Sequence, residues 1–127
     1  MNIEKYLEGV WTEGGRDWPN VDCYGIVLKV RKDLGLPDWP EWGHAKRSDG
    51  TMHQSGMEFK TKLRKCEPEV GAIIGCYSGS FLTHVAVVVD DHGILSALEI
   101  TGRSGVNCRP ISRLNRIFTK IEFYNDN

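Results

Sequence analysis

The sequence predicts an α+β fold, with N-terminal helices packed on an antiparallel sheet of about five strands. Apolar residues recur at helical spacing in the first half of the chain, most clearly over residues 23–33. After residue 68 the spacing changes, and residues 83–90 are β-branched and nearly all apolar, which is typical of a central strand. A length of 127 residues suits one core, so we expect residues 1–127 to form a single domain.

The N-terminal segments are expected to alternate between helix and loop. Residues 2–8 carry apolar side chains on one helical face and predict a short helix. Residues 11–20 contain glycines and a proline that break regular structure, which indicates a loop. That loop holds two indoles, Trp11 and Trp18, which either cap the edge of the core or wall a groove.

The clearest helix is expected over residues 23–33, followed by a loop over 36–50 and a second helix over 51–64. Asp22 is a favourable N-cap for the first helix, and Gly35 is a favourable stop. The buried stripe of this helix consists of Cys23, Ile26, Val27, Val30 and Leu34. Because the stripe begins in the first turn, we expect the thiol to be held rigidly against the core.

The second half of the chain predicts the sheet. Strands are expected at residues 70–77, 83–90, 94–99, 106–109 and 116–124. Gly93 suits a tight turn between the second and third of these strands, so we expect them to pair as a hairpin. Because helices precede strands along the chain, we expect the helices to lie on one side of the sheet.

Composition and motif spacing exclude several classes of function. The formal net charge is −1 with no basic excess, so we expect no nucleic-acid partner. No apolar run is long enough to cross a bilayer and the N-terminus lacks signal-peptide features, so we expect cytoplasmic synthesis and no membrane insertion. The four cysteines and four histidines show no CxxC or HExxH spacing, so we expect no metal, no organic cofactor and no disulfide framework.

Cys23 is the first candidate for chemistry, because it follows the N-cap of the clearest helix. The first backbone N–H groups of a helix are unpaired and its dipole is positive there. That environment favours the thiolate, which is the nucleophilic form of cysteine. The alternative is a small buried cysteine that only packs.

His84 is the second candidate, because it stands at the start of the most apolar strand. Taken alone it could be a structural histidine, but a thiolate paired with an imidazolium is an activated nucleophile, and folding can bring the two together. A third polar group usually orients the imidazole. Ser96 and Glu99 are the polar residues on the returning strand, and strand alternation places Ser96 on one face with Ile94 and Leu98.

These segments together resemble the NlpC family of papain-like cell-wall cysteine peptidases, particularly the short versions found in tailed phages and prophages. The two most specific segments are Asp22-Cys23-Tyr24-Gly25-Ile26-Val27 and Thr83-His84-Val85-Ala86-Val87. The others lie at residues 11–15, 34–37, 68–71, 93–97 and 109–124. The resemblance covers nearly the whole chain and implies the papain-like fold.

The resemblance implies a Cys–His–polar triad that hydrolyses amide bonds in peptidoglycan stem peptides. Cys23 would be the nucleophile, and its backbone N–H would help to hold the oxyanion. His84 would be the general base and then the acid for the leaving amine. Ser96 stands where the family usually has a second histidine, so it is the expected third member, with Glu99 as its substitute if the strand bends.

The resemblance also implies further site residues, partners and a location. Trp11 stands where many members have a tyrosine facing the oxyanion, and Asp22, Tyr24 and Trp18 are expected to line the oxyanion and substrate site. The expected partners are the stem peptide and other phage tail proteins. Delivery in a virion tail, or to the cell wall by another route, would suit a protein without a signal peptide.

Two other functions remain open from the sequence. A non-catalytic tail-assembly or tail-tip module could keep the fold, and the departure at Ser96 motivates that alternative. Related thiol chemistry such as acyl transfer is also compatible, because one fold hosts several chemistries. Charged loop residues that could bind substrate carboxylates or amines, or simply be solvated, are Arg16, Asp17, Lys46, Arg47 and Asp49.

Overall fold

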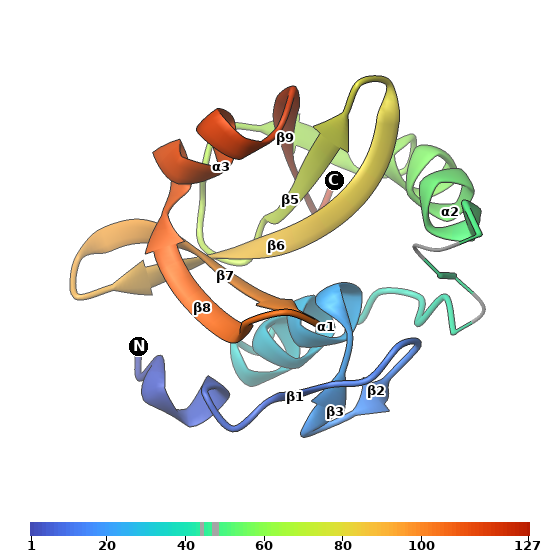
Figure 1. Ribbon diagram of the computed structural model, residues 1–127. Coiled ribbons are helices and arrows are strands. Elements are labelled where there is room, and N and C mark those ends of the chain that lie inside the picture. Colours follow the sequence, from blue (N-terminus) through green and yellow to red (C-terminus); the bar gives the residue numbers. More distant parts are fainter. Residues whose placement is uncertain (44, 47–48) are drawn as a thin grey trace.

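The computed structural model describes residues 1–43, 45–46 and 49–127, and its fold is α+β, as the sequence predicts (Figure 1). The helical elements are η1 (Glu4–Tyr6), which is a 3₁₀ turn, α1 (Cys23–Asp33), α2 (Thr51–Lys60) and α3 (Ile111–Ile117). The strands are β1 (Val10–Trp11), β2 (Arg16–Asp17), β3 (Asn20–Val21), β4 (Arg64–Cys66), β5 (Ile73–Ser78), β6 (Phe81–Asp91), β7 (Ile94–Thr101), β8 (Gly105–Pro110) and β9 (Lys120–Asn125).

The strands form two sheets. Within the described ranges the larger sheet has six strands in the order β4-β9-β5-β6-β7-β8, and all its pairings are antiparallel. The smaller sheet has the order β1-β3-β2, with β1 parallel to β3. It occupies the segment that was expected to be a loop. The sequence does not indicate this sheet, because its two-residue strands are too short to show alternation. The expectation of about five strands in one sheet is therefore corrected.

Helices cover both faces of the larger sheet, so the expectation that they lie on one side is wrong. Val85 and Val87 of β6 belong to the core formed with α1, whereas Ala86 and Val88 belong to a second core with Leu114 of α3. Figure 1 shows α1 and α3 on opposite sides of β6 and β7. None of the helices in the described part of the chain has the length and apolar character needed to cross a membrane.

The observed boundaries differ most from the expected ones at three places. The expected helix over 2–8 is reduced to the turn η1, and the expected helix over 51–64 ends at Lys60, because the residues beyond it form β4 against β9. The strand expected over 116–124 begins only at Lys120. Its first residues belong to α3, which is seven residues long and too short to show a clear helical period.

The first turn of α1 is fixed more tightly than any sequence pattern indicates. The Asp22 carboxylate accepts hydrogen bonds from the backbone N–H groups of Tyr24 and Gly25 at 3.1 and 2.8 Å, and it pairs with Arg16 at 2.6 Å. Gly25 approaches the backbone of Gly15 so closely that a Cβ atom would collide with the carbonyl oxygen. This segment therefore holds Cys23 at a fixed place beside the sheet.

We expect Asp22→Ala to lower the free energy of unfolding by about 3 kcal/mol, because it removes the N-cap and leaves the Arg16 guanidinium without its carboxylate in a largely buried position. Urea unfolding followed by circular dichroism measures the loss. Asp17→Ala removes an exposed carboxylate from the same segment and should change the free energy by less than about 0.5 kcal/mol. Equal effects of the two variants would contradict the structural role of Asp22.

Candidate active site

Cys23 is the first residue of α1, as expected from its place after the N-cap. Its side chain is buried, with 3% of the residue exposed. The thiol lies 3.8 Å from the Met52 sulfur on α2, and it is close enough to His84 to contribute to raising the pKa of the imidazole. The fold therefore brings together the two residues that the sequence singles out, although 61 positions separate them, from 23 to 84.

His84 lies in β6 and is 4% exposed. Its Nε2 is 2.7 Å from Oε1 of Glu99, and its ring stacks on Phe118 with centroids 5.8 Å apart. Because an ionised carboxylate only accepts hydrogen bonds, Nε2 carries the proton in this contact. Nδ1 is then the ring nitrogen that remains available to Cys23.

A local irregularity in β6 accompanies this orientation. The register between β5 and β6 shifts after the pair formed by Cys76 and His84, because Tyr77 then pairs with Leu82 and leaves Thr83 as an extra residue on β6. Such bulges twist a strand and redirect its side chains. The bulge lies directly beside His84 and contributes to setting the direction of the imidazole.

The orienting residue that the structure places on His84 is Glu99, not Ser96. Ser96 pairs with Val89, far along β6 from His84, and its hydroxyl donates to the carbonyl oxygen of Ile94 at 3.2 Å. Strand alternation puts Ser96 on the face of β7 that packs on α1, whereas Glu99 lies on the same face as Ala97, which packs toward α3. The β6–β7 register therefore excludes Ser96 from the imidazole.

Arg109 completes the group, although no sequence pattern points to it. Its Nε lies 3.0 Å from Oε2 of Glu99, so the two oxygens of this carboxylate contact two cationic partners. Glu99 is 3% exposed, and a buried carboxylate needs such partners. Arg109 reaches Glu99 from β8, where it pairs with Ala97 of β7. Only the β7–β8 register, which the sequence does not reveal, would have indicated it.

The electrostatics of the site favour the protonated imidazole. Burial alone would lower the pKa of His84, but hydrogen bonds and charges from Cys23 and Glu99 outweigh it and raise the pKa from 6.5 to about 9. At neutral pH His84 is therefore an imidazolium, which is the form that pairs with a thiolate. A cysteine beside such a group has the electrostatic environment of an activated nucleophile.

The four other expected site residues divide into two groups. Asp22 and Tyr24 line a cavity beside Cys23, and the Tyr24 hydroxyl donates to the Pro40 carbonyl oxygen at 2.7 Å. The two indoles pack on the N-terminal segment and the sheet. Trp18 meets Tyr6 edge to face at 5.9 Å, and Trp11 lies against Gly102 just after β7.

The charged loop residues show two roles in the described part of the chain. Arg16 is committed to Asp22, and Asp49 accepts a hydrogen bond from the backbone N–H of Thr51 at 3.0 Å. Asp17 and Lys46 are exposed. Arg47 lies outside the described residues.

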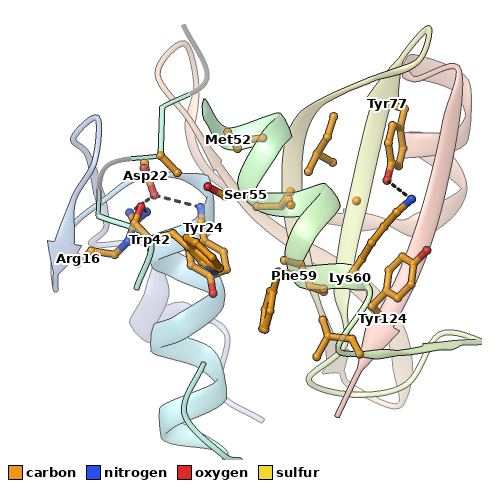
Figure 2. A pocket seen from close by; sticks show the side chains of 17 residues that line it. Arg16, Asp22, Tyr24, Trp42, Met52, Ser55, Phe59, Lys60, Tyr77 and Tyr124 are labelled. Carbon is orange, nitrogen blue, oxygen red and sulfur yellow. Dashed lines mark hydrogen bonds and ion pairs between the residues drawn. The ribbon is translucent and has the colours of Figure 1, made fainter. Parts of the chain in front are cut away.

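An apolar cavity lies beside the site, between α1, α2 and the sheet (Figure 2). Its volume is about 70 Å³. Its apolar lining residues include Met52, Phe59, Leu63, Ile73, Leu82 and Val85. Figure 2 shows α2 between the side chains of α1 and those of the sheet, so α2 forms a shared wall.

The site is built from a thiol, an imidazole and a carboxylate. Across residues 1–43, 45–46 and 49–127, no three His, Cys, Asp or Glu side chains gather as metal ligands do, and Cys23, Cys66, Cys76 and Cys108 are free thiols. The chain matches no family model, no curated protein and no solved structure. Any functional assignment therefore depends on the geometry of this site and on the sequence resemblance.

We expect iodoacetamide to label Cys23 before the other three cysteines near pH 7. Burial raises the pKa of Cys66, Cys76 and Cys108, which keeps these thiols protonated, whereas Cys23 faces an imidazolium. Mass spectrometry of tryptic peptides after timed labelling measures the order. His84→Ala should remove the preference, and equally slow labelling of all four thiols in the wild type would argue against an activated Cys23.

We expect Glu99→Gln to lower the pKa of His84 well below about 9, because one of the two groups that raise it loses its charge. Two-dimensional NMR of the imidazole during a pH titration measures the shift. Ser96→Ala should leave the His84 pKa unchanged, since the Ser96 hydroxyl bonds to Ile94. The opposite pattern would restore Ser96 as the orienting residue.

The same pKa predicts how stability depends on pH. Because folding raises the pKa of His84, the imidazolium contributes stability that is fully present below about pH 6.5 and is lost as the pH rises through about 9. Urea unfolding at pH 6, 8 and 10 should show this loss in the wild type and a smaller loss in His84→Gln. An equal loss in both proteins would contradict the assignment to His84.

Proposed function

We propose that the protein is a thiol-dependent peptidase or amidase that hydrolyses amide bonds of peptidoglycan stem peptides. The observation that carries the proposal is the group formed by Cys23, His84 and Glu99. Cys23 lies at the start of α1, and Nε2 of His84 lies 2.7 Å from Oε1 of Glu99. This group supplies a nucleophile, an acid–base residue and an orienting carboxylate. The substrate class comes from the sequence resemblance to NlpC peptidases.

In the proposed reaction the Cys23 thiolate attacks the scissile carbonyl carbon and forms a tetrahedral intermediate. The His84 imidazolium then gives its Nδ1 proton to the leaving amine as the C–N bond breaks. In the second half, His84 takes a proton from water, and the resulting hydroxide attacks the thioester and releases the acid with free Cys23. Throughout, Glu99 holds the ring through Nε2.

Stabilisation of the oxyanion is assigned to the backbone at the start of α1. The Asp22 carboxylate accepts hydrogen bonds from the backbone N–H groups of Tyr24 and Gly25. It accepts none from the backbone N–H of Cys23. A fixed backbone donor beside the nucleophile stabilises negative charge that develops in the transition state. The Asp22 cap therefore acts as a support for the donor rather than as a substrate ligand.

The place of action is also part of the proposal. The short members of the family that this chain resembles occur in phages and prophages, where a tail-associated peptidase opens the cell wall. We therefore propose association with a virion tail, with other tail proteins as partners. The Cys–His–Glu geometry supports the hydrolytic step, and the sequence resemblance supports the location.

Purified peptidoglycan stem peptides should be cleaved by the wild type, with products identified by mass spectrometry. We expect Cys23→Ala to abolish turnover, and Glu99→Gln to lower kcat by about 10²–10⁴-fold, the cost of losing an orienting carboxylate. Cys108→Ala is the matched control, since it removes a thiol outside the site and should retain turnover. Cleavage that survives Cys23→Ala would refute the proposal.

One observation favours a second candidate, a non-catalytic tail-assembly module that retains the fold. Cys23 is 3% exposed, and its thiol lies against Met52, so a substrate must displace α2 side chains to reach it. A structural module would tolerate that burial. It predicts that Cys23→Ala phage assemble and infect normally, whereas a peptidase predicts intact particles with reduced infection.

A further inference from the structure

The apolar cavity between α1, α2 and the sheet is a candidate binding site beside the nucleophile. Met52 connects the two places, because its sulfur lies 3.8 Å from the Cys23 thiol while its side chain lines the cavity. Asp22 and Tyr24, the two sequence neighbours of Cys23, also line it. Figure 2 shows Met52, Asp22 and Tyr24 at the end of the cavity where α1 begins.

The charged groups around the cavity are already paired. Arg16 binds Asp22 at 2.6 Å at one end. At the other end Lys60 lies 3.5 Å from Glu122 and 3.4 Å from the hydroxyl of Tyr77. Among the described residues that line the cavity, these pairs leave no uncompensated charge, so a charged group entering it would lose water without gaining an ion pair. The walls therefore select an uncharged, apolar occupant.

The size of the cavity limits what can enter. A volume of about 70 Å³ is roughly half that of an engineered protein cavity that holds benzene, which is about 150 Å³. That space suits a short aliphatic group of about three or four carbons rather than an aromatic ring or a long chain. Met52 is unbranched and flexible, so it can move aside and join the cavity to the thiol without a backbone change.

We propose that this cavity is a specificity site for a short aliphatic group attached near the scissile carbonyl of the substrate. The inference rests on the proposed thiol chemistry, because it places the group next to the Cys23 sulfur. Entry of the group displaces the Met52 side chain and uncovers the thiol. Occupancy of the cavity and access to the nucleophile are thus coupled through one side chain.

Gly75 of β5 offers a way to fill the cavity without distorting the fold. A Cβ atom there would lie 3.4 Å from Leu82 and 3.6 Å from Tyr77, which are ordinary contact distances. Gly75→Ala therefore adds a methyl group to the cavity wall. Gly43→Ala is the matched control, because the same methyl group there would meet nothing within 4 Å.

The first measurement uses binding and needs no catalysis. N-butylacetamide, an unreactive probe, is titrated into the wild type, and methyl NMR signals of Ile73, Leu82 and Val85 are followed. We expect saturable shifts in the wild type, Cys23→Ala and Gly43→Ala, and loss of saturation in Gly75→Ala. N-acetyl-β-alanine, a charged probe of similar length, should not bind.

The second measurement uses the thiol. Cys23 displaces iodide from N-butyliodoacetamide or from iodoacetamide, forming the S–C bond, and each rate is divided by the rate with glutathione. We expect the butyl reagent to be favoured about a hundredfold, as burial of three or four carbons predicts. Gly75→Ala should remove that preference, and Gly43→Ala should keep it.

The outcomes separate this inference from the proposed function. Absence of saturable N-butylacetamide binding, or binding unaffected by Gly75→Ala, overturns the specificity site even if stem peptides are cleaved. Equal rates with the two reagents in the wild type likewise overturn the link between cavity and thiol. If N-butylacetamide binds but no stem peptide is cleaved, the cavity remains a binding site and only the peptidase proposal is refuted.

Discussion

The buried carboxylate of Glu99 is the interaction on which the organisation of the site depends. It joins His84 of β6 to Arg109 of β8, with contacts of 2.7 and 3.0 Å to its two oxygens. A charge at 3% exposure is tolerable only with such partners, so the three strands must keep their register for the group to exist. The contact that compensates the buried charge of Glu99 also fixes the orientation of the His84 ring. The orientation of the imidazole therefore depends on the pairing of the strands.

The sequence predicted the parts of this arrangement that depend on local patterns. Cys23 and α1 followed from the Asp22 cap and the apolar stripe, and the observed bounds are the expected ones. Glu99 was only a secondary choice, because its contact depends on a β6–β7 register and a β-bulge that no local pattern reveals. Ser96 does not reach His84 for the same reason, since a position matched to a sequence motif need not lie at the required register of the strand.

Other differences between expectation and structure have similar causes. The helix α3 was missed because seven residues after Pro110 carry too little periodicity, and with it the second core went unrecognised. The small sheet was read as a loop because pairing of two-residue strands is decided by tertiary contacts. Arg109 had no sequence signal at all. Local propensity is thus sufficient to place Cys23 and insufficient to find the groups that orient His84.

The stacking of His84 on Phe118 extends the site to the second layer of the fold. Phe118 is the cap residue of α3, so the imidazole rests on the short helix that the sequence did not predict. A planar ring against the imidazole restricts its rotation about the bond to the backbone. Rotation would break the contact with Glu99, so α3 and the carboxylate restrain the same degree of freedom.

The partial exposure of Arg109 has a consequence for the effect of salt on the site. Its side chain is 25% exposed, whereas those of Glu99 and His84 are 4% and 5% exposed. Dissolved ions therefore reach one side of the carboxylate and not the other, because screening acts on charges in contact with solvent. Rising ionic strength weakens the ion pair between Arg109 and Glu99 before the one between His84 and Glu99. The charge of Glu99 then acts more fully on the imidazolium. The proton affinity of His84 is in this way coupled to the composition of the solution outside, through the arginine that contacts the other oxygen of Glu99.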